Sequence, residues 1–316
     1  MKLRSVLELR ASVRRTLRDL FDTRGFLEVD TPVLAAEVLP EAHIDPLAVS
    51  VAGGRTDRWL QASPEALMKR LLAGGSGPIY QFAHAFRDGE RGPQHDLEFV
   101  LLEWYAPGTV LDDTAELLAG LCQAVLGTEG LERLDCSAAF MAHAGLDPLV
   151  ATAEEWLAAA RRMGITLPEK LPDRPATEIC DRCFELLLAE VVQPDLGHLA
   201  PVMLEAWPVS QAAFARVDPA RPATARRFEL FVQGVELANG WEEEPSREVL
   251  AARIDAANDV RRSDGRPALP RPERLLAAHG PGMPAGVGVA LGFDRLVMLA
   301  ASARSIDEVR PFPDGG

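Results

Sequence analysis

Predicted strands follow one another directly in this chain, and this succession constrains the fold more than any other feature of the sequence. Strands that are not separated by a crossover helix pair in antiparallel fashion. We therefore predict an α+β fold with a mainly antiparallel sheet flanked by helices. The strands are IYQFAHAFR (79–87) and EFVLLEWYA (98–106), separated by the polar loop DGERGPQHDL, and then PVMLEAWP (201–208), RRFELFVQ (226–233) and GVELANGWE (234–242).

Helices are predicted before, between and after these strands. Ser63 and Pro64 form a typical helix start, a hydroxyl N-cap followed by proline at the first helical position. The Gly-x-Gly at 286–288 does not open a strand–helix–strand unit, which argues against a dinucleotide-binding fold. The spacing of apolar residues predicts helices over 3–24, 112–127 and 246–262, a strand over FLEVDTPVL (26–34), and a mainly helical insertion over 135–195 with little motif content.

The composition is that of an ordinary globular protein. Of the 316 residues, 47% are hydrophobic and 25% are charged, which suits a single domain over 1–316. The formal net charge of −14 argues against a protein that holds nucleic acid mainly through its phosphates. The sequence has neither a signal peptide nor a run of about 18 apolar residues, and its few cysteines are scattered. We therefore expect a cytoplasmic protein without a membrane partner.

A charged hairpin loop carries the first chemical signal. Arg87 ends one predicted strand, and His95 lies in the loop that leads to the next. An arginine that projects from an antiparallel hairpin can grip phosphate oxygens with two parallel hydrogen bonds, and a histidine in the loop can reach a more distal phosphate. Taken alone, the stretch is more typical of a solvated surface hairpin.

Two further segments add a cation and a pair of carboxylates. GVGVALGFDRL (286–296) places Arg295 behind a glycine-rich strand, where the missing side chains let ligand rings lie close to the backbone. Glu236 and Glu243 would face one cleft if their strand turns at Asn239-Gly240. Such a pair suits Mg²⁺ that bridges phosphates, or the capture of a cationic substrate. The alternative interpretation is an acidic hairpin end.

Together these segments resemble the three signature motifs of class II aminoacyl-tRNA synthetases, in the right order across almost the whole chain. RGFLEVDTPVL resembles motif 1, the helix–strand element of the dimer interface. AFRDGERGPQHDLEF resembles motif 2, and GVGVALGFDRL resembles motif 3, with Arg295 as its arginine. The resemblance implies the class II catalytic fold and a homodimer.

Within that class the sequence is similar to lysyl-tRNA synthetases, and closer still to their truncated relatives, the elongation factor P lysine lysyltransferases. SPEALMKRLLAGG, EFVLLEWY and VELANGWEE carry the first similarity, and PVSQAAF and the pairing of GMP with GVALGFDRL carry the second. The resemblance implies activation of lysine or (R)-β-lysine with ATP and Mg²⁺, and transfer to a lysine of elongation factor P. Motif 1 lies so near the N-terminus that we expect no anticodon-binding domain and no anticodon recognition.

The resemblance also implies an amino acid site. Glu65, in the sequence Ser63-Pro64-Glu65, would take the α- or β-ammonium group of the amino acid. Tyr105 and Glu243 would hold its side-chain ammonium, because a phenol and a carboxylate suit a desolvated cation.

The ATP site implied by the resemblance draws on motif 2, motif 3 and the segment GVELANGWE. Arg87 would bind the α-phosphate, where negative charge builds as the amino acid carboxylate attacks. Glu236, with Glu243, would ligate Mg²⁺. The other ATP-binding residues would be Asp88 and Gly89 beside the adenine, together with His95, Asp96, Leu237, Gly292 and Arg295.

One position bears on specificity, and two others depart from the family's pattern. Ala290 stands where lysyl-tRNA synthetases tend to have glycine and the lysyltransferases have alanine, and its methyl group would reshape the amino acid pocket in favour of β-lysine over α-lysine. Gly89 stands where a glutamate would contact adenine, so either Glu90 replaces it or ATP binding is weaker. Asp96 replaces an asparagine, and its charge would repel the nucleotide unless Mg²⁺ or an arginine lies close.

Three functions are therefore open at the level of the sequence. The first is the ligase that modifies elongation factor P, and the second is an enzyme of the same fold with another acceptor, such as tRNA or ammonia. The third is an inactive paralogue that binds an amino acid or a partner as a regulator. Retention of the charged residues Arg87, Glu236, Glu243 and Arg295 argues against the third, because a dead site would be free to lose them.

Overall fold

The computed structural model describes residues 2–51, 55–280 and 282–313, which fall into two compact units. Unit 1 comprises Met1–Val110, Ala124–Leu126 and Glu243–Gly316, and unit 2 comprises Leu111–Gln123 and Gly127–Glu242. Both units combine strands and helices, and their strand pairs are mostly antiparallel, so the predicted α+β class is confirmed. A single domain over 1–316 stays a prediction.

Strands of unit 1 form two sheets. In the first, β1 (Leu27–Glu28), β5 (Ile79–Phe86), β6 (Glu98–Pro107) and β11 (Gly286–Gly292) lie side by side in that order. The pair β1–β5 is parallel, whereas β5–β6 and β6–β11 are antiparallel. The second sheet has the order β2 (Leu34–Ala35), β4 (Arg55–Leu60) and β3 (Ala48–Val51).

The strand predicted over FLEVDTPVL is instead two short strands in different sheets, β1 and β2. Pro32 lies between them, and proline has no backbone N–H to donate to a sheet. The sheet pairing therefore stops before Pro32 and resumes in another sheet after it.

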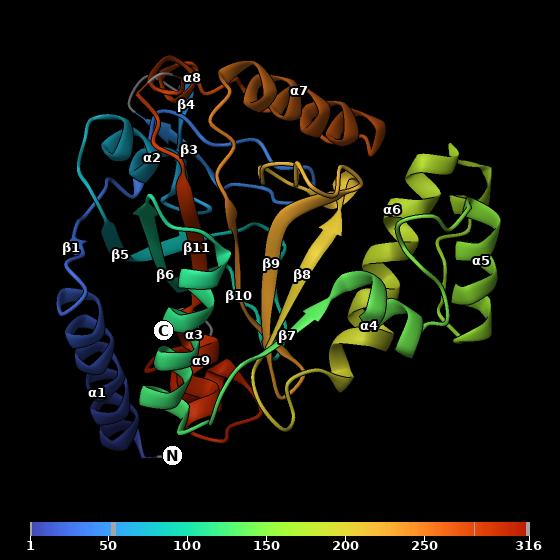
Figure 1. The fold of residues 1–316 in the computed structure, drawn as a ribbon. Coiled ribbons are helices and arrows are strands. Elements are labelled where there is room, and N and C mark those ends of the chain that lie inside the picture. Colours follow the sequence, from blue (N-terminus) through green and yellow to red (C-terminus); the bar gives the residue numbers. More distant parts are fainter. Residues whose placement is uncertain (1, 52–54, 281, 314–316) are drawn as a thin grey trace. The chain divides into compact units, whose positions relative to one another are not determined.

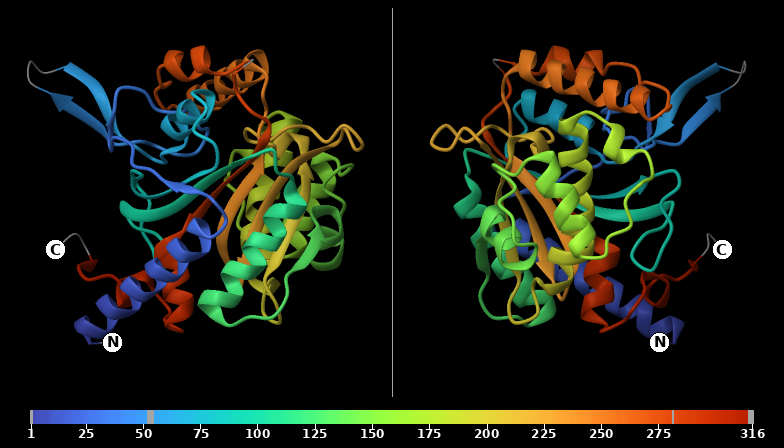
Figure 2. Two further views of the ribbon diagram at one scale, coloured as in Figure 1. Left: turned by 60° about the vertical axis from the view of Figure 1, so that its left-hand side comes forward. Right: turned by 90° about the vertical axis from the view of Figure 1, so that its right-hand side faces the viewer.

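Helices of unit 1 cover one face of its first sheet with large side chains. Phe21 of α1 (Leu3–Asp22) stacks on Tyr80 of β5 with the ring centroids 4.8 Å apart. Phe293 of α9 (Phe293–Ala300) meets Phe82 edge-on with the ring centroids 5.5 Å apart. Figure 2 shows α1 beside the C-terminal segment of the chain, where the Arg10 guanidinium donates to the carbonyl of Val309 at 3.1 Å. The other helices of unit 1 are α2 (Glu65–Ala73), α7 (Arg247–Ser263), α8 (Glu273–Ala278) and a 3₁₀ turn, η5 (Ile306–Val309).

Strands of unit 2 lie in the order β10 (Val235–Glu242), β9 (Thr224–Val232), β8 (Val202–Pro208) and β7 (Glu132–Asp135). The pairs β10–β9 and β9–β8 are antiparallel, and β8–β7 is parallel. The turn expected at Asn239-Gly240 is wrong, because both residues pair with β9 in an uninterrupted ladder. The irregularity of β10 lies earlier, as a register shift between Glu236 and Ala238.

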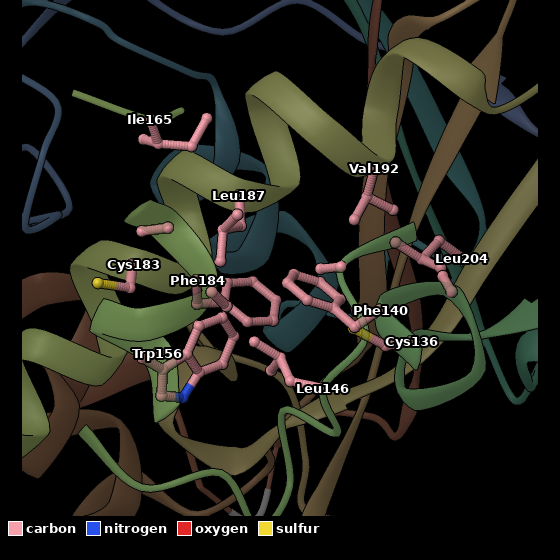
Figure 3. Packing of buried hydrophobic residues seen from close by; sticks show 14 of the residues in the cluster. Cys136, Phe140, Leu146, Trp156, Ile165, Cys183, Phe184, Leu187, Val192 and Leu204 are labelled. Atoms are coloured by element: carbon pink, nitrogen blue, oxygen red, sulfur yellow. The ribbon is translucent and has the colours of Figure 1, made fainter. Parts of the chain in front are cut away.

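Residues 135–195 are mainly helical, as predicted, and form a packed layer of unit 2. Its centre is an aromatic cluster in which Phe140 stacks on Phe184 at 4.7 Å and Trp156 meets Phe140 edge-on at 5.6 Å (Figure 3). Cys136 and Cys183 are buried in the same core, which explains them as packing residues. The helices of unit 2 are α3 (Leu111–Leu126), whose last three residues belong to unit 1, α4 (Cys136–His143), α5 (Ala153–Arg162) and α6 (Ala176–Leu187), with the shorter turns η1 (Leu171–Asp173), η2 (Leu188–Val192), η3 (Gln193–Asp195) and η4 (Val209–Gln211).

Candidate active site

Large and small side chains alternate along β11, so this strand gives one face of the unit 1 sheet large side chains and the other face small ones. Val287, Val289 and Leu291 are buried, whereas glycine or alanine stands at every other position. Because side chains directly opposite in an antiparallel pair share a face, Ala290 shares the face of Glu103 on β6. The strand pair, which runs side by side in Figure 1, therefore presents polar β6 side chains over a floor of small residues.

Gly288 lies where side chains close directly over the backbone. A Cβ atom at this position would come within 2.5 Å of Glu243 Oε1 and within 2.5 Å of Tyr105 Cε1. Both contacts are shorter than any van der Waals distance, so a side chain at this position would require Glu243 and Tyr105 to move. The structure thus brings together Tyr105 and Glu243, the two residues predicted to hold a side-chain ammonium.

The start of α2 supplies the third predicted residue of this pocket. The Ser63 hydroxyl accepts the N–H of Glu65 at 3.0 Å. Pro64 occupies the N-cap position, however, and the helical residues begin at Glu65, so the predicted start with Ser63 as the N-cap and Pro64 as the first helical residue lies one residue too early. The Ser63 hydroxyl also donates to Glu103 Oε2 at 2.8 Å, and it therefore joins Glu65 to the polar face of β6.

A buried lysine that sequence reasoning missed lies between the two predicted ammonium ligands. The Lys69 ammonium contacts Glu65 Oε1 at 2.6 Å and Glu243 Oε2 at 2.7 Å, with 1% of its side chain exposed. Burial alone would lower the pKa of Lys69, but the two carboxylates outweigh it and raise the pKa above its usual value. Lys69 is therefore a fixed positive charge in the pocket. Its spacing of four residues from Glu65 on a helix was the available signal.

Glu103 is a second pocket residue that was missed. Its carboxyl group accepts hydrogen bonds from the hydroxyls of Tyr105, at 2.7 Å, and Ser63. Burial and the neighbouring charge of Glu65 raise the pKa of Glu103 to about 8, although the two hydroxyls oppose the shift. Its place two residues before Tyr105 on a strand, and hence on the same face, could have revealed it.

Two of the predicted phosphate-binding residues meet directly. The guanidinium of Arg295, on the first turn of α9, lies 2.6 Å from His95 Nε2 and also donates to the carbonyl of Gln94 at 3.2 Å. Gly292 precedes this helix and lies against the aliphatic part of the Arg295 side chain. Motif 3 and the motif 2 loop thus converge, as predicted.

Arg87 begins the motif 2 loop as β5 ends. Its guanidinium lies over the ring of Phe99 at 5.0 Å and donates weakly to the carbonyl of Ala62 at 3.4 Å. Ala62 directly precedes Ser63, so Arg87 lies beside the segment that carries Glu65. The planar guanidinium is held by a ring face and a carbonyl.

The loop after Arg87 explains the unexpected glycine. Gly89 adopts a φ of +77°, a left-handed conformation that strains any residue with a Cβ. The following Glu90 contacts Arg87 at 3.6 Å, and the Asp88 N–H donates to the carbonyl of Asp45 at 2.8 Å. A tight turn therefore carries Glu90 back toward Arg87. Whether Glu90 replaces the expected glutamate at the adenine stays a prediction.

The charge of Asp96 is compensated. Its carboxylate pairs with Arg310 and accepts the N–H of Leu97 at 2.7 Å. Burial raises the pKa of Asp96, but the hydrogen bonds from Arg310 and Leu97 lower it overall. An arginine lies close to Asp96, as the sequence argument required for a nucleotide to be tolerated there.

Asp294, which precedes Arg295, has a role in the fold that sequence reasoning did not find. Its buried carboxylate pairs with Arg10 of α1 at 2.7 Å and accepts the N–H of Val100 at 2.8 Å. The two residues of the Asp-Arg dipeptide between β11 and α9 therefore have different roles. The aspartate ties α9 to α1 and β6, and the arginine extends to the motif 2 loop.

Glu236 and Leu237 belong to unit 2, at the register shift of β10. Glu236 is half-buried and pairs with Phe231, while Asn239 pairs with Glu229. Phe231 and Glu229 are two residues apart on β9 and therefore lie on the same face, so Glu236 and Glu229 share one face of the strand pair. The Glu229 carboxylate is already paired with Arg227 at 2.6 Å. Mg²⁺ prefers one or two carboxylates completed by phosphates and water, so Glu236 is the residue of this face that suits the ion.

Convergence of Glu236 with the arginines of unit 1 stays a prediction. Within the described residues, 2–51, 55–280 and 282–313, no group of three or more His, Cys, Asp or Glu side chains is arranged as a complete metal site. No helix in the same residues is long and apolar enough to cross a membrane.

The fold and the two converging motifs define a class of protein. The family described as tRNA synthetases class II (D, K and N) matches residues 1–315, so the chain belongs to this family. Its relatives narrow the group further. The chain is 39% identical to the elongation factor P--(R)-beta-lysine ligase of Edwardsiella ictaluri over 308 residues, which cover 96% of this chain and 93% of that protein.

Other relatives carry the same name. The protein of Haemophilus influenzae (strain PittGG) is 37% identical over 307 residues, covering 96% of this chain and 93% of its own. That of Vibrio cholerae is 37% identical over 314 residues, covering 98% and 95%. The resemblance stated from the sequence motifs is thereby confirmed.

Proposed function

We propose that this protein activates lysine or (R)-β-lysine with ATP and transfers it to a lysine side chain of elongation factor P. The observation that carries the proposal is the buried cluster of Glu65, Glu103 and Glu243 beside β6 and β11, where Tyr105 and Glu243 close over Gly288. An acidic, desolvated pocket suits an amino acid with two ammonium groups. The names of the relatives point to the same substrate and acceptor.

In this pocket, Glu65 takes the α- or β-ammonium, and Tyr105 and Glu243 take the ammonium at the other end of the substrate. Ala290 stands opposite Glu103, so its methyl group narrows the floor of the pocket. We expect this methyl to favour β-lysine over α-lysine, and an Ala290→Gly variant with an unchanged α/β preference would contradict that assignment.

ATP lies along the motif 2 and motif 3 segments. Arg87 binds the α-phosphate, Arg295 and His95 bind more distal phosphates, and Asp88 with Glu90 lines the adenine pocket beside Gly89. Mg²⁺, held by Glu236, supplies charge neutralisation for the phosphates. Lys69 already compensates Glu243, so we assign Glu243 to the amino acid and not to the metal.

The reaction needs no protein nucleophile. A carboxylate oxygen of the amino acid attacks the α-phosphorus of ATP, which forms the acyl adenylate and releases pyrophosphate. The ε-amine of the acceptor lysine then attacks the acyl carbon, AMP leaves, and the amine loses one proton. The protein contributes by holding two ligands in line and by stabilising charge at the α-phosphate, the role of Arg87.

We further propose a cytoplasmic homodimer assembled through motif 1. Leu3 and Leu7 of α1 and Leu27 of β1 are exposed apolar side chains on this element, which a second copy would cover. Light scattering of the purified protein distinguishes a dimer from a monomer.

The experiment for the proposed function is amino acid-dependent exchange of pyrophosphate into ATP, with lysine, (R)-β-lysine and uncharged amino acids as a panel. We expect exchange with one or both diamino acids. No exchange with any amino acid would indicate an inactive paralogue. Exchange without transfer to elongation factor P would indicate another acceptor, such as tRNA or a small molecule.

A further inference from the structure

A lysine side chain inside a pocket for a lysine-like substrate needs an explanation. Lys69 lies one helical turn after Glu65 on α2, and its ammonium bridges Glu65 and Glu243, the residues assigned to opposite ends of the substrate. Glu243 is itself anchored to β11, since its N–H donates to the carbonyl of Gly286 at 2.9 Å. Lys69 thus joins α2 to the strand that forms the floor of the pocket.

We propose that Lys69 is a positioning residue, which holds Glu65 and Glu243 in place and in their charged forms so that they can receive the two ammonium groups of the substrate. This inference rests on the proposed function and deepens it. Lys69 acts through the two carboxylates and is not itself a ligand of the reacting atoms.

Charge balance supports this role. Two carboxylates buried side by side repel each other, and one of them would take up a proton or move away if no cation lay between them. A protonated glutamate cannot form an ion pair with a substrate ammonium. With the substrate bound, the pocket holds three positive charges, from Lys69 and the two substrate ammoniums, against the carboxyl groups of Glu65, Glu103 and Glu243.

The same ion pairs keep Lys69 from competing with the acceptor. Only an unprotonated amine attacks an acyl adenylate, and the flanking carboxylates raise the pKa of Lys69 above its usual value. Lys69 therefore stays an ammonium, although it lies within a site that is proposed to acylate lysine side chains.

The test compares three variants in the pyrophosphate exchange assay. Lys69→Met keeps most of the side-chain volume and removes the charge, and Lys170→Met makes the same change at an exposed site. Lys69→Ala leaves a space that propylammonium fills with a charge and 1-propanol fills without one.

We expect Lys69→Met to raise the KM for the diamino acid about tenfold or more while the KM for ATP changes less than about twofold, as expected for lost binding of one substrate. Lys170→Met behaves like the wild type. Propylammonium lowers the KM of Lys69→Ala for the diamino acid, whereas 1-propanol does not.

Three results would overturn the inference. The first is an unchanged KM for the diamino acid in Lys69→Met, and the second is an equal rise of both KM values, which would indicate general damage. The third is rescue of Lys69→Ala by 1-propanol as effective as that by propylammonium, which would indicate a space-filling role. If Lys69→Met does not fold, the rescue comparison decides. Absence of exchange in the wild type contradicts the proposed function instead, so the two failures are distinguishable.

Discussion

Replacing Gly288 by alanine tests the amino acid pocket at its closest contact. The added Cβ would lie 2.5 Å from Glu243 Oε1 and 2.5 Å from Tyr105 Cε1, so both side chains must move. Overpacking of this kind costs about 1–3 kcal/mol. If that cost falls on substrate binding, KM for the diamino acid rises about 5- to 150-fold, since 1.4 kcal/mol corresponds to a factor of ten.

The assay is pyrophosphate exchange with lysine or (R)-β-lysine, in which KM for ATP serves as the internal reference. Gly286→Ala is the matched control on the same strand, because its Cβ would meet the backbone carbonyl of Ala106 rather than a pocket side chain. We expect Gly286→Ala to lower the free energy of unfolding and to change KM for both the diamino acid and ATP. A Gly288→Ala enzyme with wild-type KM values, or with both values raised equally, would refute the placement of the amino acid over Gly288.

Three further perturbations have defined outcomes. Glu103 has a pKa of about 8 and must lose its proton to balance the two positive charges of the substrate. KM for the diamino acid in the exchange assay therefore falls roughly tenfold between about pH 6.5 and 8. Glu103→Gln abolishes this pH dependence of KM. Arg310→Met lowers the free energy of unfolding by about 1.5–3 kcal/mol at neutral pH. The pKa of Asp96 is lowered in the folded protein, so the stability that the Asp96–Arg310 pair contributes is present above the unfolded pKa of Asp96 and is lost as pH falls through its folded pKa. In acid, urea melts of the wild type and of Arg310→Met must therefore give the same free energy of unfolding. Trp156→Ala empties the unit 2 core and costs about 3–5 kcal/mol in the same melts, and a loss below about 1 kcal/mol would contradict the packing in Figure 3.

The regular elements of this fold could be predicted because their patterns are local. The alternation of glycine with valine and leucine in GVGVALG marks β11, and the apolar run after Asp294 marks α9. The hairpin β5–β6 likewise matches its prediction closely. The segment FLEVDTPVL could not be predicted as two strands, because the assignment of each half to its own sheet depends on distant partners.

The site residues likewise divide into those with a local sequence signal and those that depend on distant partners. Tyr105, Glu243 and Glu65 were found from motifs, but Lys69 and Glu103 were missed although simple periodicities place them beside the others. Long-range pairs carry no local signal. Asp96 and Arg310 are 214 residues apart, so the compensation of the Asp96 charge is visible only in the folded chain.

Transfer to the protein acceptor tests the account most directly. Purified elongation factor P is incubated with the protein, ATP, Mg²⁺ and (R)-β-lysine or lysine, and its intact mass is measured, with Gly288→Ala as the matched enzyme variant. We predict that the wild type adds one lysyl residue to the acceptor, with an initial rate at limiting diamino acid that is much lower for Gly288→Ala. An unmodified acceptor, in a reaction where the same preparation exchanges pyrophosphate with a diamino acid, would contradict the assigned acceptor.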